Sequence, residues 1–156
     1  MVAAKAEASV DFVQVLLARE GGAWVRAASS SMSPLIRPGD QLRLGALERG
    51  RVRAGTIVAF RRAGALIVHR VLGDTPAGLV TKGDALVDAD EPISTRELLA
   101  RVTAIRSPGG RSIDLDRRPW PWIGGMLAAV ARMGGANPAA WKVLRIPFHL
   151  VAVFGR

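Results

Sequence analysis

The sequence of 156 residues contains no cysteine, and this absence removes several kinds of chemistry at once. Without thiols the chain can form no disulfide, no thiolate zinc site and no cysteine nucleophile. Its two histidines, His69 and His149, lie too far apart in the sequence to form a histidine-based metal motif. We therefore expect neither a metal site nor a cofactor.

Tyrosine is also absent, and aromatic residues make up only 5% of the chain. Proteins that bind single-stranded nucleic acid stack the bases on aromatic side chains, so this composition offers them little support. The formal net charge of +9, from 22 basic and 13 acidic residues, favours contact with polyanions. Because the arginines are scattered through predicted strands and turns rather than gathered on one helix, we expect no nucleic-acid partner.

Long apolar runs are missing at both ends of the sequence. The longest uncharged run near the C-terminus, residues 119–131, ends at Arg132, whereas a membrane-spanning helix needs about 20 apolar residues. Near the start, Glu7 and Asp11 interrupt the apolar run that a secretory signal would require. The sequence thus predicts neither a signal peptide nor a transmembrane helix, and we expect a cytoplasmic or peripherally membrane-bound protein.

Short β-type segments separated by Gly, Pro and Asp fill the middle of the chain. Strands are predicted at residues 23–27, 41–44, 56–60, 65–72, 78–82, 98–105 and 111–115. A helix is predicted over residues 9–19, with Ser9 as its N-cap and Gly21-Gly22 after its end. Two more helices are predicted at 125–133 and from 137 to about 145. This divides the chain into an N-terminal helix (1–22), a β domain (23–118) and a helical tail (119–156).

The tail differs from the rest of the chain in composition. Residues 119–156 hold no acidic residue, four basic residues, and three of the four tryptophans, namely Trp120, Trp122 and Trp141. Tryptophan and basic side chains beside apolar helices are typical of the membrane–water interface. Helices of this kind also serve to cover an open face of a sheet. The two interpretations are compatible, and the sequence favours neither.

Chemistry-bearing residues follow one another in a suggestive order. Residues 29–40 hold a run of serines before a Pro-containing turn, and His69 lies in a later β-type segment between β-branched neighbours. Three acids follow within one turn: Asp84, Asp88 and Asp90. A hydroxyl, an imidazole and a carboxylate can act as nucleophile, base and orienting acid. The period of two along a strand buries His69 at least by half, so a core histidine bonded to the backbone is the alternative.

Four segments of the sequence resemble, in the same order, the sequence boxes of type I signal peptidases and their LexA-like relatives. They are Ser-x-Ser-Met-x-Pro with Pro-Gly-Asp at 29–40, Gly-Thr-Ile-Val-Ala-Phe at 55–60, Val-His-Arg-Val at 68–71 and Thr-Lys-Gly-Asp at 81–84. A histidine in the third box is typical of the endoplasmic-reticulum and archaeal branch, where it replaces a general-base lysine. The resemblance covers roughly residues 25–106. It implies a mainly β fold with a β-barrel-like core of the signal peptidase/LexA type, an N-terminal helix and short C-terminal helices.

The resemblance also implies roles for individual residues. Ser31, directly before the methionine, matches the nucleophile, and His69 matches the general base. Asp90 best matches the acid that orients the histidine, and Asp84 matches a second acid of the same box. Asp88 lies close by and remains a candidate for the orienting role.

A further match concerns the oxyanion hole. Ser29 matches a position whose hydroxyl stabilises the oxyanion together with the backbone N–H of Ser31. Lys82 is the lysine closest to these boxes, but it falls in a turn, so a serine–lysine pair is not expected.

The function implied is that of a serine endopeptidase that binds a precursor or leader peptide as an extended strand and cuts after small residues. The family's membrane anchor is not evident, and Ala85-Leu86 and Ala100 depart from the family's usual residues. These departures leave the implied catalytic residues unchanged, but they leave open which substrate the chain would cut. Two alternatives are a LexA-like regulator that cuts itself and an inactive peptide-binding module. The roughly 28 residues before Ser29 are fewer than a helix-turn-helix domain with a linker needs, which favours the peptidase.

Overall fold

The computed structural model describes residues 10–48 and 52–134, which form two helices and seven strands. The helices are α1 (Val10–Glu20) and α2 (Trp120–Gly134). The strands are β1 (Gly22–Arg26), β2 (Gln41–Gly45), β3 (Ile57–Arg62), β4 (Ala65–Thr75), β5 (Gly78–Lys82), β6 (Leu98–Arg106) and β7 (Ser112–Asp114). Every predicted strand is present, with bounds within three residues of those predicted.

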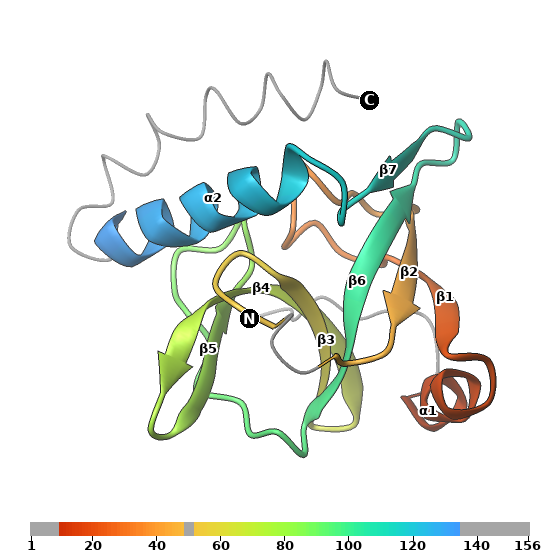
Figure 1. Cartoon of the computed structure of the whole chain (residues 1–156), viewed down its shortest axis with the longest axis horizontal. Coiled ribbons are helices and arrows are strands. Elements are labelled where there is room, and N and C mark those ends of the chain that lie inside the picture. The colour runs from red at the N-terminus through yellow and green to blue at the C-terminus, as the bar shows by residue number, and fades with distance from the viewer. Residues whose placement is uncertain (1–9, 49–51, 135–156) are drawn as a thin grey trace.

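The strands form one antiparallel sheet in the order β1-β2-β6-β3-β4-β5, and β7 pairs with β6 beside this path. Figure 1 shows that the sheet is strongly curved, with β3, β4 and β5 arching on one side and β1, β2 and β6 on the other. Among the described residues the sheet is open, with β1 and β5 at its two ends. The predicted mainly β class is confirmed, and the barrel-like core is an open curved sheet rather than a closed barrel.

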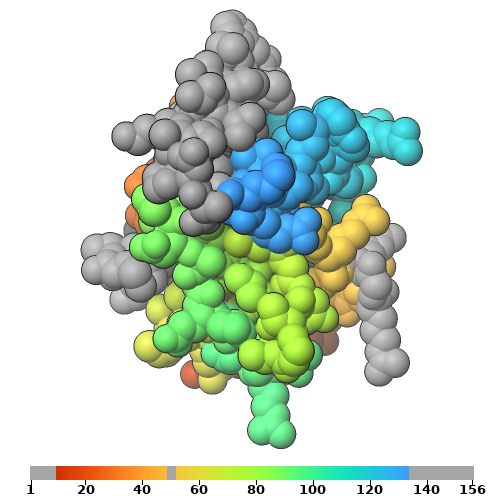
Figure 2. All heavy atoms as spheres, turned by 90° about the vertical axis from the view of Figure 1, so that its left-hand side faces the viewer, coloured from red at the N-terminus to blue at the C-terminus, as the bar shows by residue number. Residues whose placement is uncertain are grey.

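Strand β4 is buried on both faces, which differs from the half-buried strand that a period of two predicts. All of residues 66–72 are buried, so neither face of the strand meets solvent there. Helix α2 covers β4 from one side, where Leu72 packs with Ala128 and Ala131. Figure 2 shows α2 (blue) against the β4–β5 hairpin (yellow-green) and the segment before β3 (yellow). His69 and Arg70 of this strand are therefore both enclosed, on opposite faces.

Helix α2 begins earlier than predicted, at Trp120 instead of residue 125. The prediction was wrong because Pro121, Gly124 and Gly125 are poor helix formers in a helix interior. Proline is tolerated in the first turn of a helix, where its missing N–H has no partner to lose. Gly124 is required for close packing, since a Cβ there would lie 2.7 Å from the carbonyl oxygen of Gly55. Tertiary contact thus outweighs local propensity.

The surface of α2 bears on the two interpretations of the tail. Its inner face covers the sheet, as one interpretation proposes, while Trp122, Met126 and Met133 are exposed on its outer side. No helix within residues 10–48 and 52–134 is long and apolar enough to cross a membrane. The helix predicted from residue 137, Ser9, Trp141 and His149 all lie outside the described residues.

Helix α1 packs on β1 at the other end of the sheet. Its buried residues Val10 and Val13 join the main core, which also includes Leu42, Leu44 and Val102 of β2 and β6. The serine-rich loop connects β1 to β2. Because Leu42 and Leu44 of β2 belong to the main core, the core holds the end of the loop that enters β2.

Candidate active site

The loop between β1 and β2 carries the predicted nucleophile and is anchored by its own apolar residues. Its base is closed by two backbone hydrogen bonds, from the N–H of Ala27 to Asp40 and from the N–H of Gly39 to Ala27, both 2.8 Å long. Met32, Leu35 and Ile36, within five residues after Ser31, are buried in the main core. These three side chains fix the loop from inside the molecule, so the residue before Met32 is held rigidly.

The three groups predicted to act together meet at one point. The Oγ of Ser31 lies 3.2 Å from Nε2 of His69, and Nδ1 of the same ring lies 2.6 Å from Oδ2 of Asp90. The ring is 2% exposed and Ser31 is 5% exposed, so both are shielded from bulk water. A carboxylate accepts hydrogen bonds, so this geometry matches the tautomer in which Nδ1–H donates to Asp90 and Nε2 accepts from the serine hydroxyl.

Asp90 is itself held in place by Thr81, the last residue but one of β5. The hydroxyl of Thr81 donates to Oδ2 of Asp90 at 2.6 Å, and the N–H of Asp90 donates to the carbonyl oxygen of Thr81 at 2.8 Å. The side chain of His69 also meets the ring of Phe60 edge-on, with the centroids 6.2 Å apart. Contacts on several sides therefore set the orientation of the imidazole.

The structure separates the three candidate acids. Only Asp90 contacts His69. Asp84 instead binds Arg70 through two hydrogen bonds, from Nε at 2.8 Å and from Nη2 at 2.6 Å. Asp88 is exposed to solvent. Of the three, Asp90 is placed where an orienting acid must lie, and Asp84 serves the neighbouring arginine.

Ser29, the predicted oxyanion donor, lies beside Ser31. The N–H of Ser31 donates to Oγ of Ser29 at 3.3 Å, and the two serine hydroxyl oxygens are 3.5 Å apart. Because Oγ of Ser29 accepts from the N–H of Ser31, the Ser29 side chain must rotate off this N–H before both groups can donate to a substrate oxygen. The neighbouring Ser30 is exposed, and the Oγ of Ser33 donates to the carbonyl oxygen of Ile36.

The acid-bearing turn after β5 clamps the nucleophile loop from outside. The N–H of Ala85 donates to the carbonyl oxygen of Ser31 at 2.7 Å. Gly83 packs so tightly on the same carbonyl that a Cβ added there would lie 2.7 Å from the oxygen. Ser31 is thus fixed by the core on one side and by this turn on the other.

We expect Gly83→Ala to destabilise the protein by about 1–3 kcal/mol, because the new methyl group must displace both the backbone of Ser31 and the side chain of Leu86. Urea unfolding measures the loss. Gly109→Ala is the matched control, since nothing lies closer than 4.0 Å to a Cβ at that exposed position. Equal stability of the two variants would show that the clamp tolerates the methyl group.

Sequence reasoning missed the parts played by Thr81 and Arg70, although both stand inside the quoted boxes. A usable signal existed for Arg70, because a charged residue in an apolar strand needs a partner when the strand is buried. For Thr81 the only sequence signal is its place at the start of the acid box. Its contact with Asp90 depends on how the turn between them folds back.

Comparisons with models of protein families, with curated proteins and with solved structures give no match. Any functional assignment therefore depends on the residues of this chain and on their geometry.

Proposed function

We propose that the chain is a serine endopeptidase of the signal-peptidase type, with a signal peptidase/LexA-like fold. The observation that carries this proposal is the continuous chain of hydrogen bonds from Asp90 through His69 to Ser31. Its members come from the end of the acid turn, from β4 and from the β1–β2 loop, so three separate segments converge. Both links are within hydrogen-bonding distance and in the order that nucleophilic catalysis by serine requires.

The reaction begins when Oγ of Ser31 attacks the carbonyl carbon of the scissile peptide bond. His69 accepts the hydroxyl proton at Nε2, and Asp90 stabilises the resulting imidazolium at Nδ1. The N–H of Ser31 and the hydroxyl of Ser29 donate to the oxyanion, where one such donor is worth about 3–4 kcal/mol. His69 then gives its proton to the leaving amine as the C–N bond breaks. A water molecule, deprotonated by the same imidazole, hydrolyses the acyl-enzyme and frees Ser31.

The burial of the site supports a substrate that is extended and has small side chains near the cut. Ser31 is 5% and His69 2% exposed, so the surrounding residues leave little room for a bulky side chain at the scissile bond. The carbonyl groups of an extended peptide point to alternate sides. Such a peptide can pair with the backbone of a strand and needs little space when its side chains are small. We infer that the substrate is a precursor or leader peptide cut after small residues. The exposed Trp122 and Met126 of α2 are consistent with a peripheral membrane contact.

A covalent probe of the serine tests the proposal without knowledge of the substrate. We expect a fluorophosphonate reagent to modify Ser31, because the phosphorus is attacked by the same activated oxygen that attacks a carbonyl. Peptide mapping by mass spectrometry locates the adduct. The His69→Ala variant should react far more slowly, since it lacks the base.

Two outcomes would overturn the proposal. If Ser31 stays unmodified while the protein is folded, the chain is an inactive peptide-binding module. If the purified chain instead loses an internal bond in a Ser31-dependent way, it is a self-cleaving regulator of the LexA type.

A further inference from the structure

A hollow lies on the face of β4 opposite to His69. It has a volume of about 330 Å³ and is bounded by the residues before β3, by the middle of β6 and by the first turns of α2. Arg70, which follows His69 in β4 and points to the other face, forms its floor. None of the residues of the Ser31–His69–Asp90 chain lines it.

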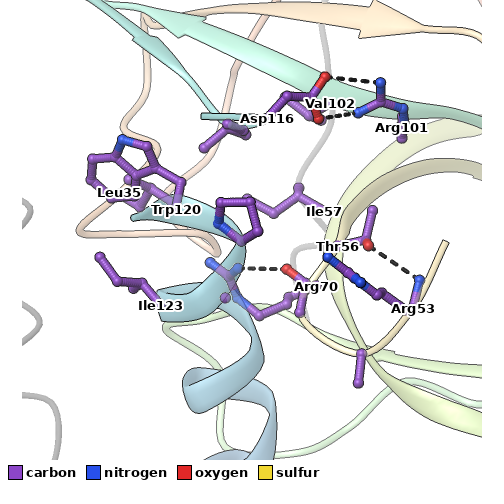
Figure 3. A pocket seen from close by; sticks show the side chains of 15 residues that line it. Leu35, Arg53, Thr56, Ile57, Arg70, Arg101, Val102, Asp116, Trp120 and Ile123 are labelled. Atoms are coloured by element: carbon purple, nitrogen blue, oxygen red, sulfur yellow. Dashed lines mark hydrogen bonds and ion pairs between the residues drawn. The ribbon is translucent and has the colours of Figure 1, made fainter. Parts of the chain in front are cut away.

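The hollow has two walls of different character (Figure 3). Leu35, Trp120 and Ile123 make an apolar wall on one side. Arg53 and Arg101 lie on the other side, and Arg70 lies between Arg53 and the apolar wall. A ligand that matches both walls must carry an apolar body and a group that accepts hydrogen bonds.

The hydrogen-bond donors of the arginines in the hollow do not all have partners. Arg70 is fully engaged, by Asp84 and by the carbonyl oxygen of Gly55 at 2.9 Å. Arg101 binds the carboxylate of Asp116 through its two terminal nitrogens, and this contact raises its pKa above the ordinary range of an arginine. Its Nε is buried and has no hydrogen-bond partner. A buried donor left in this way calls for an acceptor brought from outside.

Arg53 adds an unbalanced charge. Within residues 10–48 and 52–134 its guanidinium makes no ion pair, and only its backbone N–H is bonded, to the hydroxyl of Thr56. Arg70 is paired with Asp84, and Arg101 is paired with Asp116 and lies 3.8 Å from Oε1 of Glu48, so Arg53 is the arginine of the lining that has no ion pair with a described residue. A monoanion can pair with Arg53, whereas a second negative charge would meet the carboxylates of Asp116 and Glu48.

We propose that this hollow binds a small amphipathic carboxylate. Its carboxylate accepts hydrogen bonds from Nε of Arg101 and from the guanidinium of Arg53, and its apolar body packs against Trp120 and Ile123. The site lies outside the peptidase machinery and does not depend on the proposed cleavage reaction.

Binding is tested with N-acetyl-leucine as the probe, on the full chain carrying Ser31→Ala, so that the result is independent of any peptidase activity. Chemical shifts in two-dimensional NMR spectra follow the titration, and the indole N–H of Trp120, identified by comparison with Trp120→Phe, reports on this wall. We expect saturable binding with a shift of the Trp120 signal. N-acetyl-leucinamide, which lacks the charge, and inorganic phosphate, which lacks the apolar body, should each bind at least about tenfold more weakly.

A charge variant locates the site. Arg53→Gln should weaken N-acetyl-leucine binding about tenfold, since it removes one charge-assisted contact from an exposed side chain. Arg111→Gln, which replaces another exposed arginine in the loop between β6 and β7, should leave the affinity unchanged. The proposal fails if the carboxylate does not saturate, if Arg53→Gln and Arg111→Gln behave alike, or if phosphate binds as well as N-acetyl-leucine.

Discussion

Replacing Ser31 by alanine is expected to lower kcat/KM for peptide cleavage at least about a thousandfold. The reason is chemical rather than structural. The variant loses the oxygen that forms the covalent bond, while Met32 and the carbonyl of residue 31 still anchor the loop. A pool of extended peptides with alanine or glycine at successive positions provides substrates, and mass spectrometry of the products measures the rates. Unchanged cleavage by Ser31→Ala would refute the mechanism.

Non-additivity makes this test sharper. His69→Ala alone should cost about as much as Ser31→Ala, and the double variant should be no slower than either, because the two residues act as one unit. Ser30→Ala is the matched control, since this neighbouring hydroxyl is exposed and should not affect the rate. A double variant with multiplied losses would mean that Ser31 and His69 contribute independently and do not form a nucleophile–base pair.

The order of the candidate site residues could be predicted from sequence, and the family resemblance favoured Asp90 as the acid beside His69, but the residue pattern alone left Asp84, Asp88 and Asp90 open. Ser31 and His69 stand in boxes with fixed neighbours, and the structure brings them within 3.2 Å. Asp84, Asp88 and Asp90 share one turn, and their side chains diverge because that turn folds back on Thr81. Such a path depends on contacts with β4 and β5, which no local pattern encodes.

The strands could be predicted because their sequence signals are local. The predictions that were wrong, the burial of β4 and the start of α2, concern features that tertiary packing decides. Period-two patterns with Gly and Pro between them located all the strands, because those signals are local. The burial of β4 on both faces follows from α2, which is distant in sequence. The start of α2 at Trp120 depends in turn on the contact between Gly124 and Gly55. Long-range contacts, rather than propensity, decided both points.

Breaking the ion pair between Arg70 and Asp84 is expected to reduce the free energy of unfolding by about 3–5 kcal/mol. The two side chains are 4% and 8% exposed, and they form two parallel hydrogen bonds. Asp84→Ala leaves the guanidinium of Arg70 buried between β4 and α2 without its anion. The loss is large because a buried charge has neither solvent nor partner. Urea unfolding with an unchanged m-value measures it.

Two comparisons separate the cost of an unpaired charge from the loss of packing. The double variant Arg70→Met/Asp84→Leu removes both charges and keeps most of the volume, so it should be considerably more stable than Asp84→Ala. Arg61→Ala breaks the pair with Asp11, whose side chains are 43% and 86% exposed, and should cost less than about 1 kcal/mol. If the double variant is as unstable as Asp84→Ala, packing rather than charge holds this part of the molecule. If it is stable but Ser31 reacts slowly, the pair positions the acid turn that clamps the nucleophile.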